Sequence, residues 1–452
     1  MNLLQDTIAA ICTPAGSGAL GIIRVSGPDA ISLVNGVFSR DISQTPGHRL
    51  VYGNLVNGNQ ILDEVVLSVF RGPKSFTRED TIEISCHGSP YILREALMLL
   101  TRQGARLAEA GEFTQRSYLN GAMDLAQAEA VADLIASTSE GAHKLAMSQL
   151  RGGVSDELKD LREQLLNFTS LIELELDFSE EDVEFADRSQ LEALIQRIGI
   201  RLDSLIGSFS FGNAVKEGVP TVIMGRPNAG KSTLLNTLLN ENRAIVSDIA
   251  GTTRDVIEDR VVLEGIEFRL MDTAGVRETG DVIEAEGVKR TLNLAKRASL
   301  LLYIFDLQTE SVAEARDYLQ TVEVPENAQI LLVGNKLDLG NPTPESAEDL
   351  ILISAKAHAH IDELRHQMVE SVRAFSHLQP EQAIISNVRH LDALHKARTA
   401  LQDVQNGMAM GISGDLLAID IRTVLHYIGE ITGEITTDEV LGNIFSKFCI
   451  GK

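Results

Sequence analysis

The stretch Gly225-Arg-Pro-Asn-Ala-Gly-Lys-Ser232 decides the fold of the chain around it. It matches GxxxxGK[ST], and it lies between an apolar run over 219–224 and a helix-forming run over 233–239. Its glycines allow backbone N–H groups to surround phosphate oxygens at a helix N-terminus, where the helix dipole favours anions. We expect Lys231 to reach the β- and γ-phosphates and Ser232 to bind magnesium.

Two further motifs belong to the phosphate side of a GTPase. Gly251-Thr-Thr-Arg-Asp255 has the place of a switch segment, in which Thr253 is the expected magnesium ligand. Asp272-Thr-Ala-Gly275 follows a strand-like run, so we expect Asp272 near the magnesium ion, in its second shell, and the Gly275 N–H near the γ-phosphate. The next residue is Val276, where Ras has its water-orienting glutamine, so another group must orient the water.

Two motifs are typical of guanine recognition. Asn335-Lys-Leu-Asp338 follows an apolar run, and its aspartate accepts two hydrogen bonds that guanine offers and adenine does not. Ser354-Ala-Lys356 is the expected last loop on the base side. Together with the phosphate loop, these motifs predict GTP binding and hydrolysis. The expected GTP contacts are Asn228, Ala229, Gly230, Lys231, Ser232, Thr233, Ser247, Asp248, Ile249, Ala250, Gly251, Thr252, Thr253, Asp272, Thr273, Ala274, Gly275, Asn335, Lys336, Asp338, Ser354, Ala355 and Lys356.

The 452 residues are enough for several domains, and the charge distribution suggests where they divide. The formal net charge is −24, of which only −1 falls on residues 1–120 and −11 falls on residues 121–217. We expect an N-terminal α+β domain, a helical domain in two parts and, between these parts, a doubly wound Ras-like α/β G domain. The expected bounds are 1–120, then 121–217 and 379–452 for the helical parts, and 218–378 for the G domain.

Local patterns agree with this α/β and α multidomain class. Short β-rich runs over 20–25, 65–70 and 81–85 alternate with turn residues in the first segment. Leucines and isoleucines recur at spacings of three and four over 158–172 and 191–205, which indicates two long helices. The acidic stretch between them is expected to be a solvated connection.

Composition excludes several classes of protein. The three scattered cysteines contain no CxxC pair, so a disulfide scaffold and a zinc-binding cysteine pair are excluded. No apolar run reaches the roughly 18–20 residues of a membrane span. The N-terminus lacks the basic region of a signal peptide, so we expect a cytoplasmic protein without a membrane partner. The net negative charge argues against non-specific coating of nucleic acid.

The motifs together resemble the MnmE (TrmE) family of tRNA modification GTPases, and the resemblance runs end to end. It rests on GRPNAGKS, DIAGTTRD, DTAGVRE, NKLD and the final Cys449-Ile-Gly-Lys452. It also covers segments 21–27, 75–80, 111–114 and 124–130. The resemblance implies a bacterial or organellar GTPase that works with the flavoprotein MnmG, in an expected heterotetramer. Together they add an aminomethyl or carboxymethylaminomethyl group at C5 of the wobble uridine of certain tRNAs.

The resemblance also implies a potassium-dependent reaction, in which G domains dimerise across the nucleotide. Asn228 matches the potassium-ligating asparagine of the family, and backbone oxygens around Ser247, Ile249 and Thr252 complete the shell. Glu284 matches the catalytic glutamate that orients the water, and Lys231 acts beside it on the phosphates. A monovalent cation beside the phosphates supplies the charge that an arginine finger supplies elsewhere.

The N-terminal segment resembles the tetrahydrofolate-binding and dimerisation domain of the family. Arg24 and Glu83 match positions that contact 5-formyl- or 5,10-methylene-tetrahydrofolate, and Lys452 is also available. Ala122 departs from the pattern, because the family commonly has a basic residue at this position. Cys449 is either a nucleophile for uridine C6 or a small structural thiol.

Two other functions fit the G motifs. A ribosome-assembly or RNA-binding GTPase shares them, but it usually carries a basic RNA-binding module, and no segment here is net basic. A GTP-dependent dimerisation switch would leave the chemistry to its partner. Folate binding distinguishes the modification enzyme from the ribosome-assembly GTPase, and the sequence leaves the dimerisation switch open.

Overall fold

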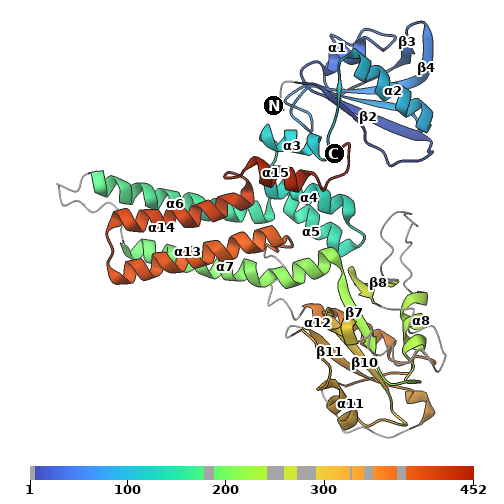
Figure 1. The fold of residues 1–452 in the computed structure, drawn as a ribbon, viewed down its shortest axis with the longest axis vertical. Helices are drawn as coiled ribbons and strands as arrows, with labels where there is room; N and C mark the ends of the chain where they lie inside the picture. Colours follow the sequence, from blue (N-terminus) through green and yellow to red (C-terminus); the bar gives the residue numbers. More distant parts are fainter. Residues whose placement is uncertain are drawn as a thin grey trace. The chain divides into compact units, whose positions relative to one another are not determined.

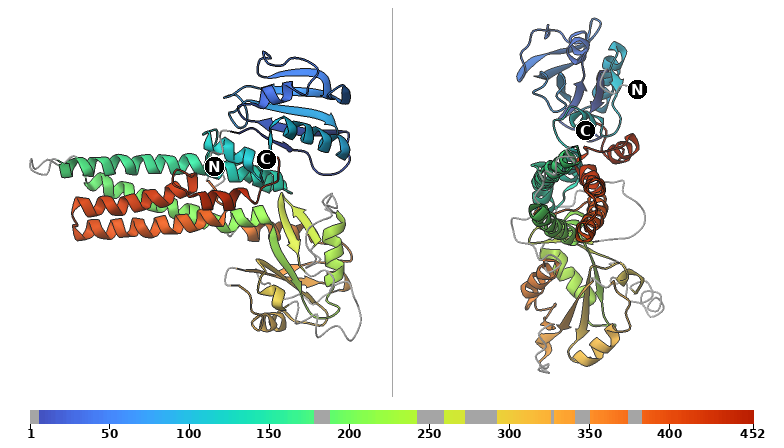
Figure 2. Two further views of the ribbon diagram at one scale, coloured as in Figure 1. Left: turned by 45° about the horizontal axis from the view of Figure 1, so that its top comes forward. Right: turned by 90° about the vertical axis from the view of Figure 1, so that its left-hand side faces the viewer.

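The computed structural model describes residues 6–177, 188–241, 259–271, 292–325, 328–340, 350–373 and 383–452 (Figures 1 and 2). The chain divides into two compact units, each described here by itself. The first unit consists of Met1–Ile135, Gln149–Leu166 and Leu425–Lys452. The second unit consists of Ala136–Ser148 and Asn167–Val424.

A six-stranded sheet in the order β3-β4-β5-β2-β1-β6 forms the base of the first unit. β1 and β6 pair in parallel, and the other neighbours pair antiparallel. The three strands predicted from β-rich runs are confirmed as β2, β4 and β5. The strands are β1 (Ile8–Ile11), β2 (Leu20–Ser26), β3 (Arg49–Asn57), β4 (Gln60–Phe70), β5 (Thr81–His87) and β6 (Arg106–Leu107).

The two faces of this sheet differ in what they contact. Ile23 and Val25 of β2 belong to the apolar core that α1 (Ala30–Asn35) and α2 (Pro90–Gln103) cover. Because side chains alternate along a strand, Arg24 lies on the opposite face. That opposite face holds the candidate functional residues described below.

Helices α3 and α15 bring the C-terminus to the opposite face of the sheet. α3 (Glu112–Leu119) and α15 (Asp438–Phe445) pack through Tyr118 and Phe445. Beyond α15, Ile450 forms an isolated antiparallel bridge with Ala110. Gly451 has a φ of +97°, and a Cβ there would lie 2.5 Å from the Ile11 carbonyl oxygen, so this close approach requires glycine. Along the chain, α3 is followed by α4 (Leu125–Ala136), α5 (Glu140–Leu150) and α6 (Gly153–Asp177).

The second unit contains a six-stranded sheet in the order β12-β11-β10-β7-β9-β8. Helices α8 (Lys231–Glu241) and α12 (Ile361–Arg373) pack on one face, and α11 (Val312–Leu319) packs on the other. β10 is buried along its whole length between these layers. The doubly wound α/β fold is therefore confirmed. The strands are β7 (Val219–Met224), β8 (Asp259–Leu263), β9 (Ile266–Leu270), β10 (Leu300–Asp306), β11 (Gln329–Asn335) and β12 (Leu350–Leu352).

One strand of this sheet departs from the expected parallel arrangement. β8 pairs antiparallel with β9, while the other neighbours are parallel. The reason is local: Glu264 and Gly265 connect the two strands with φ values of 46° and 84°, the left-handed conformation of a two-residue hairpin turn. β8 thus forms an antiparallel edge on a parallel sheet.

Helices before and after the α/β segment pack together in the second unit. α7 (Arg188–Glu217) and α13 (Val388–Met410) lie side by side (Figure 1). The Ile385 N–H donates to Ser208 Oγ at 3.0 Å, and Arg398 pairs with Asp203 at 2.8 Å, so the two helices run antiparallel. α14 (Gly414–Thr432) follows α13. Within the described ranges, no helix has the length and apolar character of a membrane span.

The contact between α7 and the segment before α13 yields a stability prediction. Gly212→Ala places a Cβ 2.1 Å from the Ile385 carbonyl oxygen, so we expect it to lower the free energy of unfolding by about 1–3 kcal/mol. Gly207→Ala is the matched control, because a Cβ there meets no described heavy atom within 4 Å. The control should gain about 0.5–1 kcal/mol from helix propensity. Denaturation followed by circular dichroism checks both, and equal shifts would contradict the packing.

Candidate functional site

The phosphate loop crosses from β7 to α8 close to the strand ends. A Cβ at Gly225 would lie 2.0 Å from the Ile304 carbonyl oxygen, and Asn228 has a φ of +62°. Lys231 Nζ donates to the carbonyl oxygens of Gly225 and Arg226, at 2.8 and 2.9 Å. The lysine ammonium is therefore held over the loop, close to the N–H groups that would bind a phosphate.

A buried asparagine connects the phosphate loop to the base-side loops. The side chain of Asn335 donates from Nδ2 to the Ala229 carbonyl oxygen at 2.8 Å and accepts at Oδ1 from the Ala355 N–H at 3.0 Å. Gly230 lies against this amide, because a Cβ there would be 2.1 Å from Asn335 Nδ2. Three motifs predicted separately from the sequence thus meet at one side chain.

The base-side loops also bind one another. Ser354 Oγ donates to Asp338 Oδ1 at 2.6 Å and accepts from the Ala357 N–H at 3.1 Å. Asp338 is exposed, and within the described part of the chain its hydrogen bond from Ser354 uses only one of the two carboxylate oxygens. This geometry presents a carboxylate edge to a base that offers two N–H donors.

Lys336 is fixed from the neighbouring strand. Its φ is +67°, and its Nζ donates to Asp306 Oδ2 at 2.7 Å, at the end of β10. Burial by itself raises the pKa of Asp306, but the hydrogen bonds from Lys336 and the Gln308 N–H outweigh it and hold that pKa below its ordinary value. The Asp306 carboxylate therefore stays charged at neutral pH.

The remaining predicted GTP contacts divide into two groups. Ser232 and Thr233 begin α8, and Lys356 is exposed on the last loop. Twelve predicted residues lie outside the described residues: Ser247, Asp248, Ile249, Ala250, Gly251, Thr252, Thr253, Asp272, Thr273, Ala274, Gly275 and Glu284. Their roles stay predictions.

A second candidate site lies on the open face of the first unit. Arg24 on β2 and Glu83 on β5 are direct cross-strand partners. Arg24 donates from Nε and Nη2 to Glu83 Oε1, at 3.0 and 2.8 Å, and the two side chains are 13% and 27% exposed. The Arg24 guanidinium also lies 5.4 Å from the ring centres of both Phe76 and Phe113. Two aromatic rings and a carboxylate thus fix this cation.

The C-terminal residues complete this site. Arg24 Nη1 donates to the Gly451 carbonyl oxygen at 3.4 Å, and Lys452 Nζ lies 5.9 Å from the Phe76 ring centre. Cys12 also donates from Sγ to the Gly451 oxygen, at 3.1 Å, and burial raises the pKa of its thiol although Arg24 opposes the shift. Cys449 is exposed. Cys449 was the cysteine expected at this site, but the thiol inside the cluster is Cys12.

Ala122 lies on a turn that the Arg78 side chain contacts. Ala122 is exposed, and its N–H donates to the Ser117 carbonyl oxygen at 2.9 Å. Arg78 reaches the same turn, with Nη1 at 3.1 Å from the Asn120 carbonyl oxygen. A guanidinium therefore stands beside the position where the family commonly has a basic residue.

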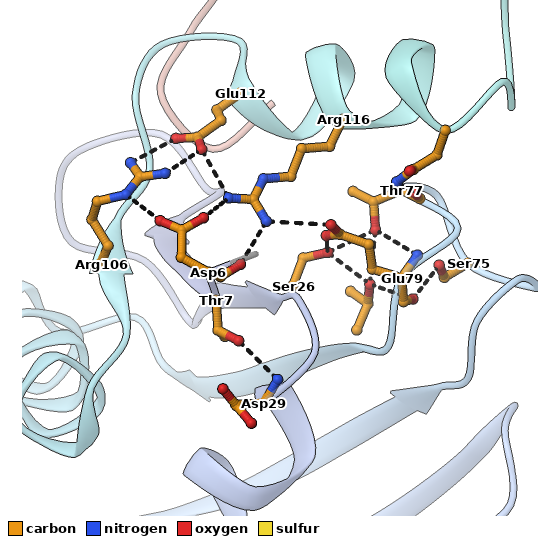
Figure 3. A network of polar contacts seen from close by, with 12 residues as sticks. Asp6, Thr7, Ser26, Asp29, Ser75, Thr77, Glu79, Arg106, Glu112 and Arg116 are labelled. Carbon is orange, nitrogen blue, oxygen red and sulfur yellow. Dashed lines mark hydrogen bonds and ion pairs between the residues drawn. The ribbon is translucent and has the colours of Figure 1, made fainter. Parts of the chain in front are cut away.

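A buried charge network supports the loop that carries Phe76 (Figure 3). Arg116 on α3 is fully buried, and its guanidinium contacts Asp6 at 2.5 Å, Glu112 at 3.1 Å and Glu79 at 3.3 Å. Glu79 in turn accepts from Ser26 Oγ at 2.7 Å. Because a buried cation without partners is costly, these contacts fix α3 against the loop 75–80.

The same helix binds the backbone of that loop directly. Ser117 Oγ donates to the Phe76 carbonyl oxygen, and Asn120 Nδ2 donates to the Thr77 carbonyl oxygen, each at 2.7 Å. Loop and helix therefore hold Phe76 in place beside Arg24. Phe76, Phe113, Cys12 and Gly451 are the site residues that sequence reasoning missed.

Comparisons with known proteins cover both units. Residues 7–122 match the family model described as GTP-binding protein TrmE N-terminus, and residues 125–449 match the MnmE helical domain. The tRNA modification GTPase MnmE of Cytophaga hutchinsonii is 54% identical over 452 residues, which are 99% of this chain and 98% of that protein. The protein of the same name from Bacteroides thetaiotaomicron is 50% identical over 465 residues, with 99% and 100% covered.

Solved structures also match part of the chain. A crystal structure of Era in complex with MgGDPNP and a segment of 16S ribosomal RNA is 28% identical and has a TM-score of 0.26. The match covers 40% of this chain and 65% of that chain.

The approach of Gly230 to Asn335 predicts the outcome of one substitution. Gly230→Ala drives a Cβ into the Asn335 amide and displaces the loop N–H groups, so we expect nucleotide affinity to fall by about 100-fold or more. Gly340→Ala is the control, because Gly340 also has a positive φ but a Cβ there meets no described heavy atom within 4 Å. Titration with a fluorescent GTP analogue measures both. Equal affinities of the two variants would refute the proposed contact.

Proposed function

Because the chain belongs to the MnmE family of tRNA modification GTPases, we propose that it couples GTP hydrolysis to a one-carbon transfer onto tRNA. The second unit binds and hydrolyses GTP, and the first unit binds a tetrahydrofolate one-carbon donor. With the flavoprotein MnmG, the chain adds an aminomethyl or carboxymethylaminomethyl group at C5 of the wobble uridine.

One observation carries the GTP part of the proposal. The phosphate loop, Asn335 and the Asp338–Ser354 pair lie together beyond the carboxyl ends of β7, β11 and β12. Nucleotides bind at this edge of doubly wound sheets. The N–H groups at the start of α8 bind the phosphates, and Asp338 accepts from the guanine N–H donors.

The phosphate side neutralises charge with the chain's own groups and with two metal ions. Lys231 reaches the β- and γ-phosphates from its position over the loop. Ser232 and Thr253 would hold magnesium, with support from Asp272, and the ion would neutralise charge on the phosphate oxygens. The Asn228 side chain is exposed on the loop and offers an amide oxygen to potassium. Glu284 orients the water, since position 276 is valine.

The first unit has a donor set that fits a folate. Glu83 uses Oε1 for Arg24, so Oε2 is available to accept from the N–H donors of a pterin ring. Phe76 and Phe113 supply flat apolar surface beside it. Because Arg24 is engaged by Glu83 and Gly451, we assign the anionic tail of the folate to Lys452. When bound, 5-formyl- or 5,10-methylene-tetrahydrofolate supplies the carbon that is transferred.

The proposed assembly follows from the family and the charge. The chain dimerises through its N-terminal segment, its G domains associate in the nucleotide-bound state, and MnmG completes a heterotetramer. A chain with a net charge of −24 is a poor tRNA binder by itself, so a more basic partner makes many of the phosphate contacts. The reaction takes place in the cytoplasm. Family membership favours this function over a ribosome-assembly GTPase.

Potassium dependence is tested on the GTPase rate. We expect replacement of potassium by sodium to lower turnover by about 10-fold or more, because the cation offsets charge that develops on the phosphates. Asn228→Ala should remove most of the difference between the salts, whereas Asn236→Ala, an exposed asparagine on α8, should not. Equal rates of the unmodified chain in both salts would exclude the potassium assignment.

Folate binding is tested by calorimetry with 5-formyl-tetrahydrofolate on the full chain. Glu83→Gln removes the charge that pairs with Arg24 and an acceptor for the pterin, so affinity should fall by about 10-fold or more. Glu64→Gln, an exposed glutamate on β4, is the control and should bind as the unmodified chain does. Absence of binding to the unmodified chain would assign the one-carbon chemistry to the partner.

A further inference from the structure

A buried carboxylate beyond β10 contacts the phosphate loop from the side. Glu310 Oε1 lies 3.2 Å from Arg226 Nε and accepts a hydrogen bond from the Tyr303 hydroxyl at 2.9 Å. The Glu310 side chain is 2% exposed, the Arg226 side chain is 50% exposed, and Tyr303 is fully buried. A buried carboxylate thus tethers the second residue of the loop.

The main chain of Arg226 holds the catalytic lysine. Its carbonyl oxygen accepts from Lys231 Nζ at 2.9 Å and from the Ala229 N–H at 3.3 Å. The ion pair with Glu310 holds the Arg226 side chain. Because the side chain and the carbonyl oxygen belong to one residue, this ion pair also restricts the position of the carbonyl oxygen. Glu310 therefore acts on Lys231 through Arg226.

We propose that Glu310 is a positioning residue for GTP hydrolysis, which fixes Lys231 by holding Arg226. This inference rests on the GTP site proposed above and assigns to that site a residue outside the G motifs. The Tyr303 hydroxyl orients the carboxylate, and burial together with Glu310 raises the pKa of Tyr303 well above its ordinary value. The tyrosine therefore remains a hydrogen-bond donor at all physiological pH values.

The turn from Asp306 to Glu310 also contacts the base-side loop, through Asp306 and Lys336. The Glu310 N–H donates to the Asp306 carbonyl oxygen at 3.0 Å, and the Asp306 side chain holds Lys336. The two carboxylates of this turn thus reach opposite ends of the nucleotide site. Loss of Glu310 should change the phosphate side alone. The chemical step needs Lys231 on the γ-phosphate, so it should slow by more than GDP affinity falls, since GDP keeps only the β-phosphate contact.

The experiment measures kcat, KM and GDP affinity for the full chain and its variants. Glu310→Gln and Arg226→Ala should each lower kcat by about 10-fold or more, because small displacements of a catalytic group are costly, and GDP affinity should change less than about 3-fold. Arg226→Lys should retain more activity than Arg226→Ala. Asp317→Asn is the matched control: this exposed carboxylate also lies on α11, so kcat should not change.

The double variant separates a tether from two independent effects. If Glu310 acts through Arg226, the Arg226→Ala/Glu310→Gln chain should be no slower than Arg226→Ala alone. Additive losses would overturn the inference. Normal kcat in an Arg226→Ala variant whose circular dichroism matches that of the unmodified chain would also overturn it. Absence of GTP turnover in the unmodified chain would overturn the proposed function itself, whereas normal turnover with an unaffected Glu310→Gln variant would overturn only this inference.

Discussion

The close approach of the phosphate loop to β10 and β11 is the constraint on which the second unit depends. Gly225 lies against the Ile304 carbonyl oxygen, and Gly230 lies against the Asn335 amide, at separations that leave no room for a Cβ. Asn335 then binds both the phosphate loop and the last base-side loop. Because the approach is so close, the loop N–H groups and the loop that carries Asp338 have fixed relative positions, as recognition of a whole nucleotide requires.

The candidate site of the first unit depends on a different constraint. It holds the Arg24 guanidinium largely buried, away from bulk water. Arg24 donates to the Glu83 carboxylate and to the Gly451 carbonyl oxygen, and its guanidinium lies near two aromatic rings. Two of these groups come from distant parts of the chain: Phe113 lies on α3, and Gly451 lies beyond α15. The C-terminal motif is thus part of the N-terminal unit, and Arg116 keeps the intervening loop in place.

Local patterns in the sequence predict much of this architecture. The apolar run over 219–224 coincides with β7, and the periodic leucines lie in α6 and α7, because strands and amphipathic helices leave a signal in neighbouring residues. The antiparallel direction of β8 was not predicted, because the hairpin turn at Glu264–Gly265 was not recognised in the sequence. The G motifs predicted the loops of the nucleotide site. They did not predict the Glu310–Arg226 pair, because no spacing rule relates residues on loops that follow two different strands. Cys12 and Phe76 were missed for the same reason.

The central claim is that this one chain joins a GTP site to a one-carbon site for the modification of tRNA. Mass spectrometry of tRNA nucleosides from cells that lack the gene tests it most directly, with the intact gene restored on a plasmid as the control. We expect wobble uridines to lose their C5 aminomethyl-type group in the deletion strain and to regain it on restoration. Unchanged wobble uridines in the deletion strain would contradict it.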